Sequence, residues 1–169
     1  MQKSINRNLI LDPDQVEKKI KRMAFQIVED NCNEKFLVLA GIWDRGYFLA
    51  QRLAAELKNA GFRIQLIKIN INKRNPGGTG KAAKQPGSGI SGKAVILVDD
   101  VLNFGKTLLY ACREFLPHPV KKIKTAVLVN REHCLFPVKV DFSGLNLSTT
   151  LQEQVRVEIK NGRWFVYLV

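Results

Sequence analysis

Two adjacent carboxylates, Asp99 and Asp100, directly follow four apolar residues in the middle of the chain. The run from 95 to 98 is typical of a buried strand, and a short loop with Gly105 and Thr107 separates the acids from an apolar pattern of helical period. Because open α/β sheets bind ligands at the carboxyl ends of their strands, we expect both acids to face a ligand. Two carboxylates can hold a sugar diol or a hydrated magnesium ion.

The loop after the acids has the composition of a phosphate-binding loop. Backbone N–H groups at the start of a helix bind phosphate. We expect this role for the backbone from Asn103 to Thr107 and for the Thr107 hydroxyl, with Lys106 adding positive charge. The acid pair also fits a simpler interpretation, in which the two carboxylates only cap the helix or face its dipole.

An apolar strand ending in an acid also occurs in ATPases, which need a second glycine-rich loop for the nucleotide phosphates. The only candidate for that loop, 77–82, has Asn75 where its first glycine should stand. It also has Ala82 where a hydroxyl should bind magnesium. These differences exclude the ATPase interpretation.

The whole chain has the composition of one globular domain. Its 169 residues are 46% apolar and 25% charged, no apolar run is long enough for a membrane span, and the N-terminus does not resemble a signal peptide. The cysteines Cys32, Cys112 and Cys134 show no metal or redox spacing. We therefore expect reduced thiols, a cytoplasmic location and no membrane partner.

The formal net charge of +12 indicates which kinds of partner the protein would attract. No acid stands between Glu56 and Asp99, whereas basic residues are spread through that interval. Such a field attracts a polyphosphate ligand or a nucleic acid, and a solvated basic face has the same composition. Composition alone does not separate these possibilities.

The elements that position these residues alternate between helix and strand. Asp12 should cap a helix that begins at Pro13, with Gln15 completing a capping box. We predict a second helix over 46–60, ended by Gly61, and a third after the phosphate loop. Buried strands are predicted at 36–40, 62–71, 93–98 and 124–130. The predicted fold class is therefore α/β, with a mostly parallel central sheet flanked by helices and carrying antiparallel additions.

Two further segments complete this prediction. Alternating apolar residues from Val155 to Leu168, interrupted by Asn161 and Gly162, predict a C-terminal hairpin with a type I′ turn. The segment 72–92 is rich in glycine and carries only basic charge, so we predict a long mobile loop.

Several blocks of the sequence resemble the type I phosphoribosyltransferases, most closely their PyrR group of pyrimidine attenuation regulators and uracil phosphoribosyltransferases. The run 95–107 is similar to the family's phosphate-loop signature, and Gly41 to Gly46 is similar to the Gly-Ile-x-x-Arg-Gly loop of the group. The opening through Asp12 and a downstream block from Ala126 to Asn146 also resemble that group in order and spacing.

The resemblance implies a single type I phosphoribosyltransferase domain over 1–169, with 72–92 as a flexible flap over the pyrophosphate. The implied activity is transfer of the 5-phosphoribosyl group from 5-phosphoribosyl 1-pyrophosphate (PRPP) to a nucleobase. Uracil is the expected base, and UMP and pyrophosphate are the expected products. The alternatives are a nucleotide-sensing RNA-binding regulator of pyrimidine genes, or a module that binds PRPP or a nucleotide with little turnover. A homodimer or a higher homo-oligomer is expected.

The resemblance also assigns roles to residues. Asp99, Asp100 and Arg45 would be catalytic, and Mg²⁺ would enter with PRPP through water near the two acids, without direct protein ligands. PRPP would also contact Asn103, Phe104, Gly105, Lys106 and Thr107. The pyrophosphate loop would comprise Ile42, Trp43, Asp44, Arg45 and Gly46. The base would lie near Asn130, Arg131 and Phe136, with His133 and Pro137 close by.

The chain departs from the family pattern at several of these positions. Phe104 stands where the family usually has Thr or Ser, and Asn103 where many purine-using members have an Asp that acts as a base. Asp44 adds an anion to the pyrophosphate loop, and Asn130 and Leu145 replace an Asp and a Lys of the PyrR group. A changed substrate, reduced activity and a purely regulatory role are all compatible with these differences.

Overall fold

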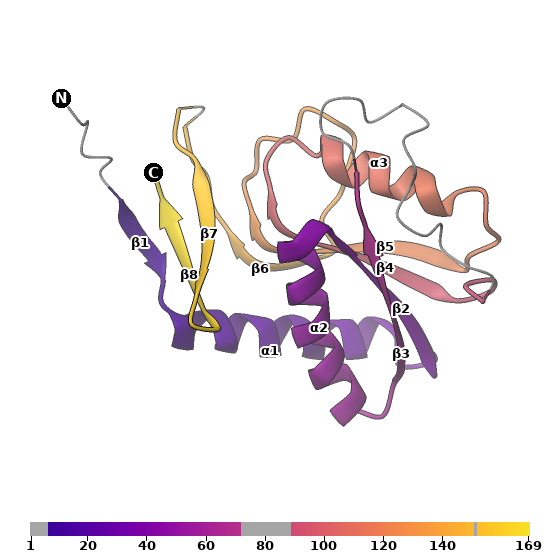
Figure 1. Ribbon diagram of the computed structural model, residues 1–169. Coiled ribbons are helices and arrows are strands. Elements are labelled where there is room, and N and C mark those ends of the chain that lie inside the picture. Colours follow the sequence, from indigo (N-terminus) through magenta and orange to yellow (C-terminus); the bar gives the residue numbers. More distant parts are fainter. Residues whose placement is uncertain (1–6, 72–88, 151) are drawn as a thin grey trace.

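The computed structural model describes residues 7–71, 89–150 and 152–169 (Figure 1). It contains a five-stranded parallel sheet and a separate three-stranded antiparallel sheet. In chain order the elements are β1 (Asn8–Leu11), α1 (Pro13–Asp30), β2 (Phe36–Ile42), α2 (Trp43–Asn59), β3 (Arg63–Ile69), β4 (Ala94–Leu102), α3 (Lys106–Phe115), β5 (Lys122–Asn130), β6 (Phe142–Asn146), β7 (Val155–Lys160) and β8 (Arg163–Leu168). The predicted α/β class is confirmed.

The parallel sheet has the strand order β3-β2-β4-β5-β6, so β4 lies at its centre. All five strands are parallel, and the helices α2 and α3 connect β2 to β3 and β4 to β5. We had expected the antiparallel strands to extend this sheet, but they do not. They form a second sheet, β1-β8-β7, that joins the two ends of the described chain.

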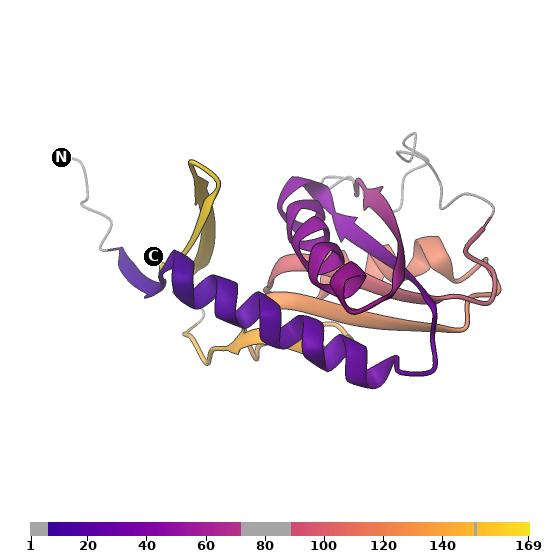
Figure 2. The ribbon, with the colours of Figure 1, turned by 90° about the horizontal axis from the view of Figure 1, so that it is seen from below.

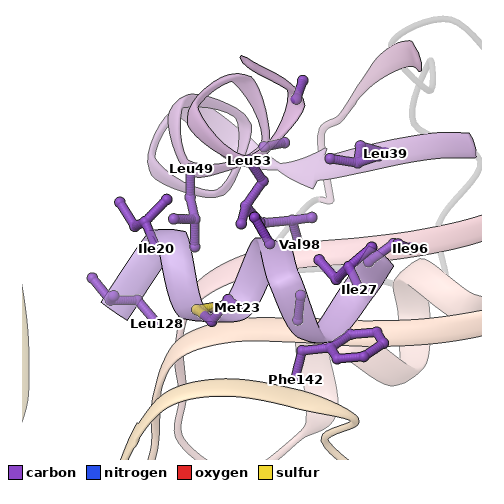
Figure 3. Close-up of a cluster of buried hydrophobic side chains, with 14 of the residues drawn as sticks. Ile20, Met23, Ile27, Leu39, Leu49, Leu53, Ile96, Val98, Leu128 and Phe142 are labelled. Carbon is purple, nitrogen blue, oxygen red and sulfur yellow. The ribbon is translucent and has the colours of Figure 1, made fainter. Parts of the chain in front are cut away.

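Each face of the parallel sheet has its own hydrophobic cluster because side chains alternate along the strands. Ile96 on β4 packs with α1 and α2 through residues such as Ile20 and Leu53 (Figure 3). Val95 and Leu97 face the other way and pack with α3. Figure 2 accordingly shows α1 and α2 on one side of the sheet and α3 on the other.

Local sequence signals explain how several elements begin and end. Asp12 accepts a hydrogen bond from the Gln15 N–H at 2.8 Å, and the Gln15 side chain accepts one from the Asp12 N–H at 2.9 Å, which confirms the capping box. Asn161 and Gly162 have φ angles of 51° and 74°, as a type I′ turn requires, and the hairpin is confirmed.

Other boundaries were predicted wrongly. β4 continues through the acid pair to Leu102, and α2 begins at Trp43 rather than at Gly46. Strands β1 and β6 were not predicted at all.

Most of the predicted mobile loop, 72–88, lies outside the described residues. Its last part is not an open loop: Ile90 is 1% exposed within the cluster on the α3 side, and the Gly92 N–H donates to the Pro119 carbonyl at 2.8 Å. Among the helices of the described chain, none is long and apolar enough to span a membrane.

Candidate active site

The acid pair lies past the middle of β4, and the register of this strand with β5 is unbroken from Asp99 to Leu102. Val98 and Val101 are three positions apart, so regular alternation would place them on opposite faces of the sheet. Both pack against the same hydrophobic cluster, because that cluster continues from the α1–α2 face to residues of β7 such as Val155. The Asp100 N–H donates to the Asp99 carboxylate at 2.9 Å. Both carboxylates line the same cavity.

Arg45, in the first turn of α2, connects the acid pair to the antiparallel sheet. Its Nε atom lies 3.1 Å from Oδ2 of Asp100, and its Nη1 donates to the Val157 carbonyl of β7 at 2.9 Å. The Arg45 side chain is 50% exposed whereas that of Asp100 is 13% exposed, so the cation faces the cavity and the acid lies below it. A guanidinium can bridge two acceptors in this way because its donors form a rigid fork.

The surroundings of Asp99 disfavour the charged form of its carboxyl group. Burial raises the pKa of Asp99 well above its ordinary value, and the neighbouring Asp100 carboxylate raises that pKa further. Arg45 acts in the opposite direction, but its effect on the Asp99 pKa is smaller. A cation or a ligand hydroxyl group that binds to the pair would favour the charged form of Asp99.

Two glycines allow α2 to begin against the sheet. A Cβ atom on Gly41 would lie 2.3 Å from the Tyr47 Cα, and one on Gly46 would lie 2.6 Å from the Val98 carbonyl oxygen. No side chain fits at either position. The prediction of a loop from Gly41 to Gly46 is wrong, because this segment comprises the end of β2 and the first turn of α2.

Trp43 marks the turn between that strand and that helix. Its φ angle is 57°, in the left-handed region that bulky residues rarely occupy. Such backbone strain often occurs at functional sites. Ile42, Trp43, Asp44 and Arg45 all line the cavity, and of these four only Ile42 is almost fully buried.

Asp44 does not stand alone as an extra anion. Its carboxylate pairs with the Nζ of Lys68, near the end of β3, at 2.5 Å. The same ammonium group lies 5.9 Å from the centre of the Tyr47 ring. The charge that we expected to oppose pyrophosphate is thus balanced by a neighbouring cation, and its position in the first turn of α2 suits the helix dipole.

The phosphate loop places the open end of α3 in the cavity. Gly105, with a φ angle of 87°, precedes the helix, and no side chain caps it. The first N–H groups of a helix have no partners within it, so they remain available to an anion. The Phe104 carbonyl accepts from the N–H groups of Leu135 and Phe136 at 3.0 and 3.1 Å, and the Phe104 ring lines the cavity.

The residues assigned to the base occupy different places. Arg131 is only 4% exposed, and its guanidinium donates to three protein acceptors: Asn103 Oδ1 at 2.9 Å, Thr149 Oγ1 at 2.9 Å and the Thr150 carbonyl at 3.1 Å. The His133 ring contacts the Thr149 carbonyl.

Asn130 and Phe136 each have a partner within the protein. Asn130 donates from Nδ2 to Asn146 Oδ1 at 3.1 Å. Phe136 is tied to the phosphate loop through its N–H. Among the described residues, neither Asn130 nor Phe136 lines the cavity, whereas Arg131 does.

The cavity has two lobes of about 560 and 500 Å³. The first contains Arg45 and Asp100, and the second contains the start of α3. The residues common to both lobes are Asp99, Val101, Asn103, Thr107, Gln154 and Val155. Sequence reasoning missed the contribution of 154–157. The hairpin was recognised, but nothing in those residue types shows that β7 lies over the end of β4.

Residues 7–158 match the phosphoribosyl transferase domain. The chain is 37% identical over 161 residues to bifunctional protein PyrR 1 of Lactiplantibacillus plantarum, which covers 89% of each protein. It is 34% identical over 171 residues to bifunctional protein PyrR of Streptomyces coelicolor, covering 94% of this chain and 88% of that protein.

Solved structures show the same fold at lower identity. The hypoxanthine phosphoribosyltransferase of Trypanosoma cruzi superposes with a TM-score of 0.76 at 16% identity, covering 94% of this chain and 95% of that one. A hypoxanthine-guanine phosphoribosyltransferase of Bacillus anthracis gives 0.72 at 22% identity, covering 83% and 82%. The chain belongs to the phosphoribosyltransferase family of type I fold. Within that family, its relatives place it in the PyrR group.

Proposed function

We propose that the protein transfers the 5-phosphoribosyl group from PRPP to uracil, forming UMP and pyrophosphate. The observation that carries this proposal is that the acid pair and the uncapped start of α3 line one continuous cavity. One ligand can therefore place its diol on the carboxylates and its 5′-phosphate on the helix N-terminus.

Each group at the site has a defined task in this reaction. Asp99 and Asp100 hold the ribose hydroxyls, directly or through metal-bound water, and Arg45 faces the leaving pyrophosphate. The bond between C1 and the pyrophosphate oxygen breaks, a ring nitrogen of the base forms the new bond to C1, and the proton of that nitrogen passes to solvent or to the leaving pyrophosphate. Positioning and electrostatic stabilisation of the leaving group carry such a step.

Magnesium fits the donor set of the site. Hard carboxylate oxygens suit Mg²⁺, which keeps several of its waters and binds through one or two carboxylates together with substrate phosphates. Asp99 and Asp100 provide those oxygens, and no cluster of three or more potential metal ligands occurs in the described part of the chain. When bound, the ion would neutralise part of the pyrophosphate charge.

A base screen tests the proposal. Uracil, cytosine, hypoxanthine, guanine and adenine are each incubated with PRPP and Mg²⁺, and pyrophosphate release is measured. We expect release with uracil, and none from a variant that combines Asp99→Asn and Asp100→Asn and retains its melting transition. Binding of UMP without release from any base would instead indicate a nucleotide-binding module.

A second function, RNA binding controlled by nucleotide, is favoured by the basic face of α1. Lys18 and Lys21 are exposed there, and the resemblance to the PyrR group implies an RNA partner. Arg22 is less available, because it donates to the Gly144 carbonyl at 2.5 Å. Nearby Lys19 is partly buried.

Fluorescence anisotropy with a labelled RNA hairpin, with and without UMP, tests this second function. The variant Lys18→Ala, Lys21→Ala should bind more weakly and show a shallower salt dependence. The control is Lys35→Ala, Lys58→Ala, which removes the same charge from exposed positions outside α1. Equal losses in both variants, with no effect of UMP, would indicate only non-specific attraction.

A further inference from the structure

We propose that Asn103 presents its amide NH₂ group to the cavity and thereby selects a base that offers a carbonyl oxygen at that place, with Arg131 fixing the orientation. This inference rests on the proposed function and concerns the specificity of the same site. Asn103 is exposed and lines both lobes of the cavity, one residue beyond the end of β4.

The orientation follows from hydrogen-bond chemistry. Nη1 of Arg131 lies 2.9 Å from Oδ1 of Asn103. A guanidinium has donors only, so the atom of the Asn103 amide that faces it must be the oxygen. The NH₂ group of Asn103 then points away from Arg131.

Arg131 cannot readily release this contact. Its Nε and Nη2 are held by Thr149 Oγ1 and the Thr150 carbonyl, and its own N–H donates to the Leu102 carbonyl at 3.1 Å. The side chain is almost fully buried. If the Asn103 amide turned over, two donors would face each other and a buried N–H of Arg131 would lose its acceptor, which is costly.

The surroundings of Asn103 suit a flat heterocycle better than a phosphate or a sugar. Besides Asp99 and Thr107, which are assigned to the diol and the phosphate, the two lobes share the apolar Val101 and Val155 and the polar Gln154. Apolar walls with a few fixed polar groups are typical of small-molecule sites. The carboxylates of β4 and the start of α3 already provide for the diol and the phosphate.

A donor at this position favours uracil over cytosine. Uracil has a carbonyl oxygen where cytosine has an amino group, and hypoxanthine differs from adenine in the same way. An amino group facing the Asn103 NH₂ would leave two donors without an acceptor. We therefore expect UMP to bind more tightly than CMP, and IMP more tightly than AMP, by about tenfold in each pair.

The decisive variant is Asn103→Asp, with nucleotide binding measured by calorimetry. An Asp carboxylate is an acceptor, so the UMP:CMP affinity ratio should move toward CMP by about tenfold or more. The variant should fold, because Arg131 would then have an ionic partner. The added charge weakens binding of every nucleotide, but the ratio cancels that effect. Asn103→Leu should remove the discrimination without reversing it.

Asn33→Asp is the matched control. Asn33 lies in the exposed turn after α1, so this substitution makes the same chemical change outside the cavity lining. It should leave the UMP:CMP ratio unchanged. If Asn103→Asp weakens UMP and CMP equally, Asn103 contacts the ribose or phosphate and the inference is wrong. If the unaltered protein binds no nucleotide, the proposed function itself fails.

Discussion

The Nε atom of Arg45 lies 3.1 Å from the Asp100 carboxylate, although the two residues come from the first turn of α2 and the last third of β4. The same guanidinium reaches the Val157 carbonyl on the antiparallel sheet. Arg45 therefore couples the acid pair to the strand that covers it. An arginine that bridges two structural units is difficult to replace with another cation.

We expect Arg45→Ala to weaken PRPP binding by roughly 10- to 100-fold, since a charge-assisted hydrogen bond contributes about 1.5–3 kcal/mol. Arg45→Lys should recover only part of this loss, because an ammonium group lacks the fork geometry. Calorimetry in the presence of Mg²⁺ measures the affinity. Arg52→Ala is the control: Arg52 lies on the same helix but pairs with Glu17 on α1. Equal effects in the two alanine variants would contradict a role at the site.

The raised pKa of Asp99 predicts a pH dependence of stability in the metal-free protein. Because the folded chain holds this proton more tightly than the unfolded chain, stability falls as pH rises from the ordinary Asp range to the raised pKa. Asp99→Asn removes this effect. The variant should therefore melt at a higher temperature than the unaltered protein at neutral to alkaline pH, with little difference under acidic conditions.

Thermal melting over a pH series checks this prediction. Asp14→Asn, at an exposed position in the first turn of α1, makes the same chemical change away from the acid pair and serves as the control. A gain for Asp99→Asn that is the same at every pH would mean that titration of Asp99 is not its cause.

Gly46→Ala should destabilise the fold by roughly 1–3 kcal/mol, because the new methyl group would overlap the Val98 carbonyl. The carbonyl belongs to the central strand and cannot move without disturbing the acid pair. Gly61→Ala is the control for backbone strain. Gly61 has a φ angle of 94°, but no atom lies within 4 Å of the added carbon, so a loss of stability there is not steric. Chemical denaturation measures the stability of both variants, and calorimetry should show a loss of PRPP affinity for Gly46→Ala alone.

Asp44→Thr should tighten pyrophosphate binding severalfold. The substitution removes an anion from the cavity rim and also releases Lys68 from its ion pair, so that both changes favour a polyanion. Lys68→Met is the complementary variant and should weaken pyrophosphate. The difference between the two variants should shrink as salt concentration rises. Unchanged affinity in both would place the leaving group elsewhere.

The sequence was sufficient to predict the elements whose signals are local. The capping box at Asp12 and the turn at Asn161–Gly162 depend on residues within a few positions of each other, and both are confirmed. β4 was predicted to stop at Val98 because Asp is unfavourable in strands. Pairing with β5 extends β4 through both acids, and such pairing is not visible in a local pattern. β1 was missed because its four residues are too few for a periodic signal.

The candidate site was likewise predicted only in part. The resemblance led us to Asp99, Asp100 and Arg45, and the structure brings them together around one cavity. The resemblance did not indicate that Arg45 would bind a backbone carbonyl, because every residue has one and the sequence does not identify which carbonyl is the acceptor. Nor did it show that Arg131 would donate to three groups of the protein. Both contacts depend on segments that meet only in three dimensions.

The hydrogen bond from Arg45 to Val157 spans 112 residues of sequence. Contacts of such long range form slowly, since the entropy of closing a large loop is lost before the contact can offset it. On a ribosome, the parallel sheet through β4 and β5 emerges before β7 does. Arg45 therefore gains its contact with Val157 only after the hairpin has formed. The ability to bind PRPP should be among the last properties to appear during refolding.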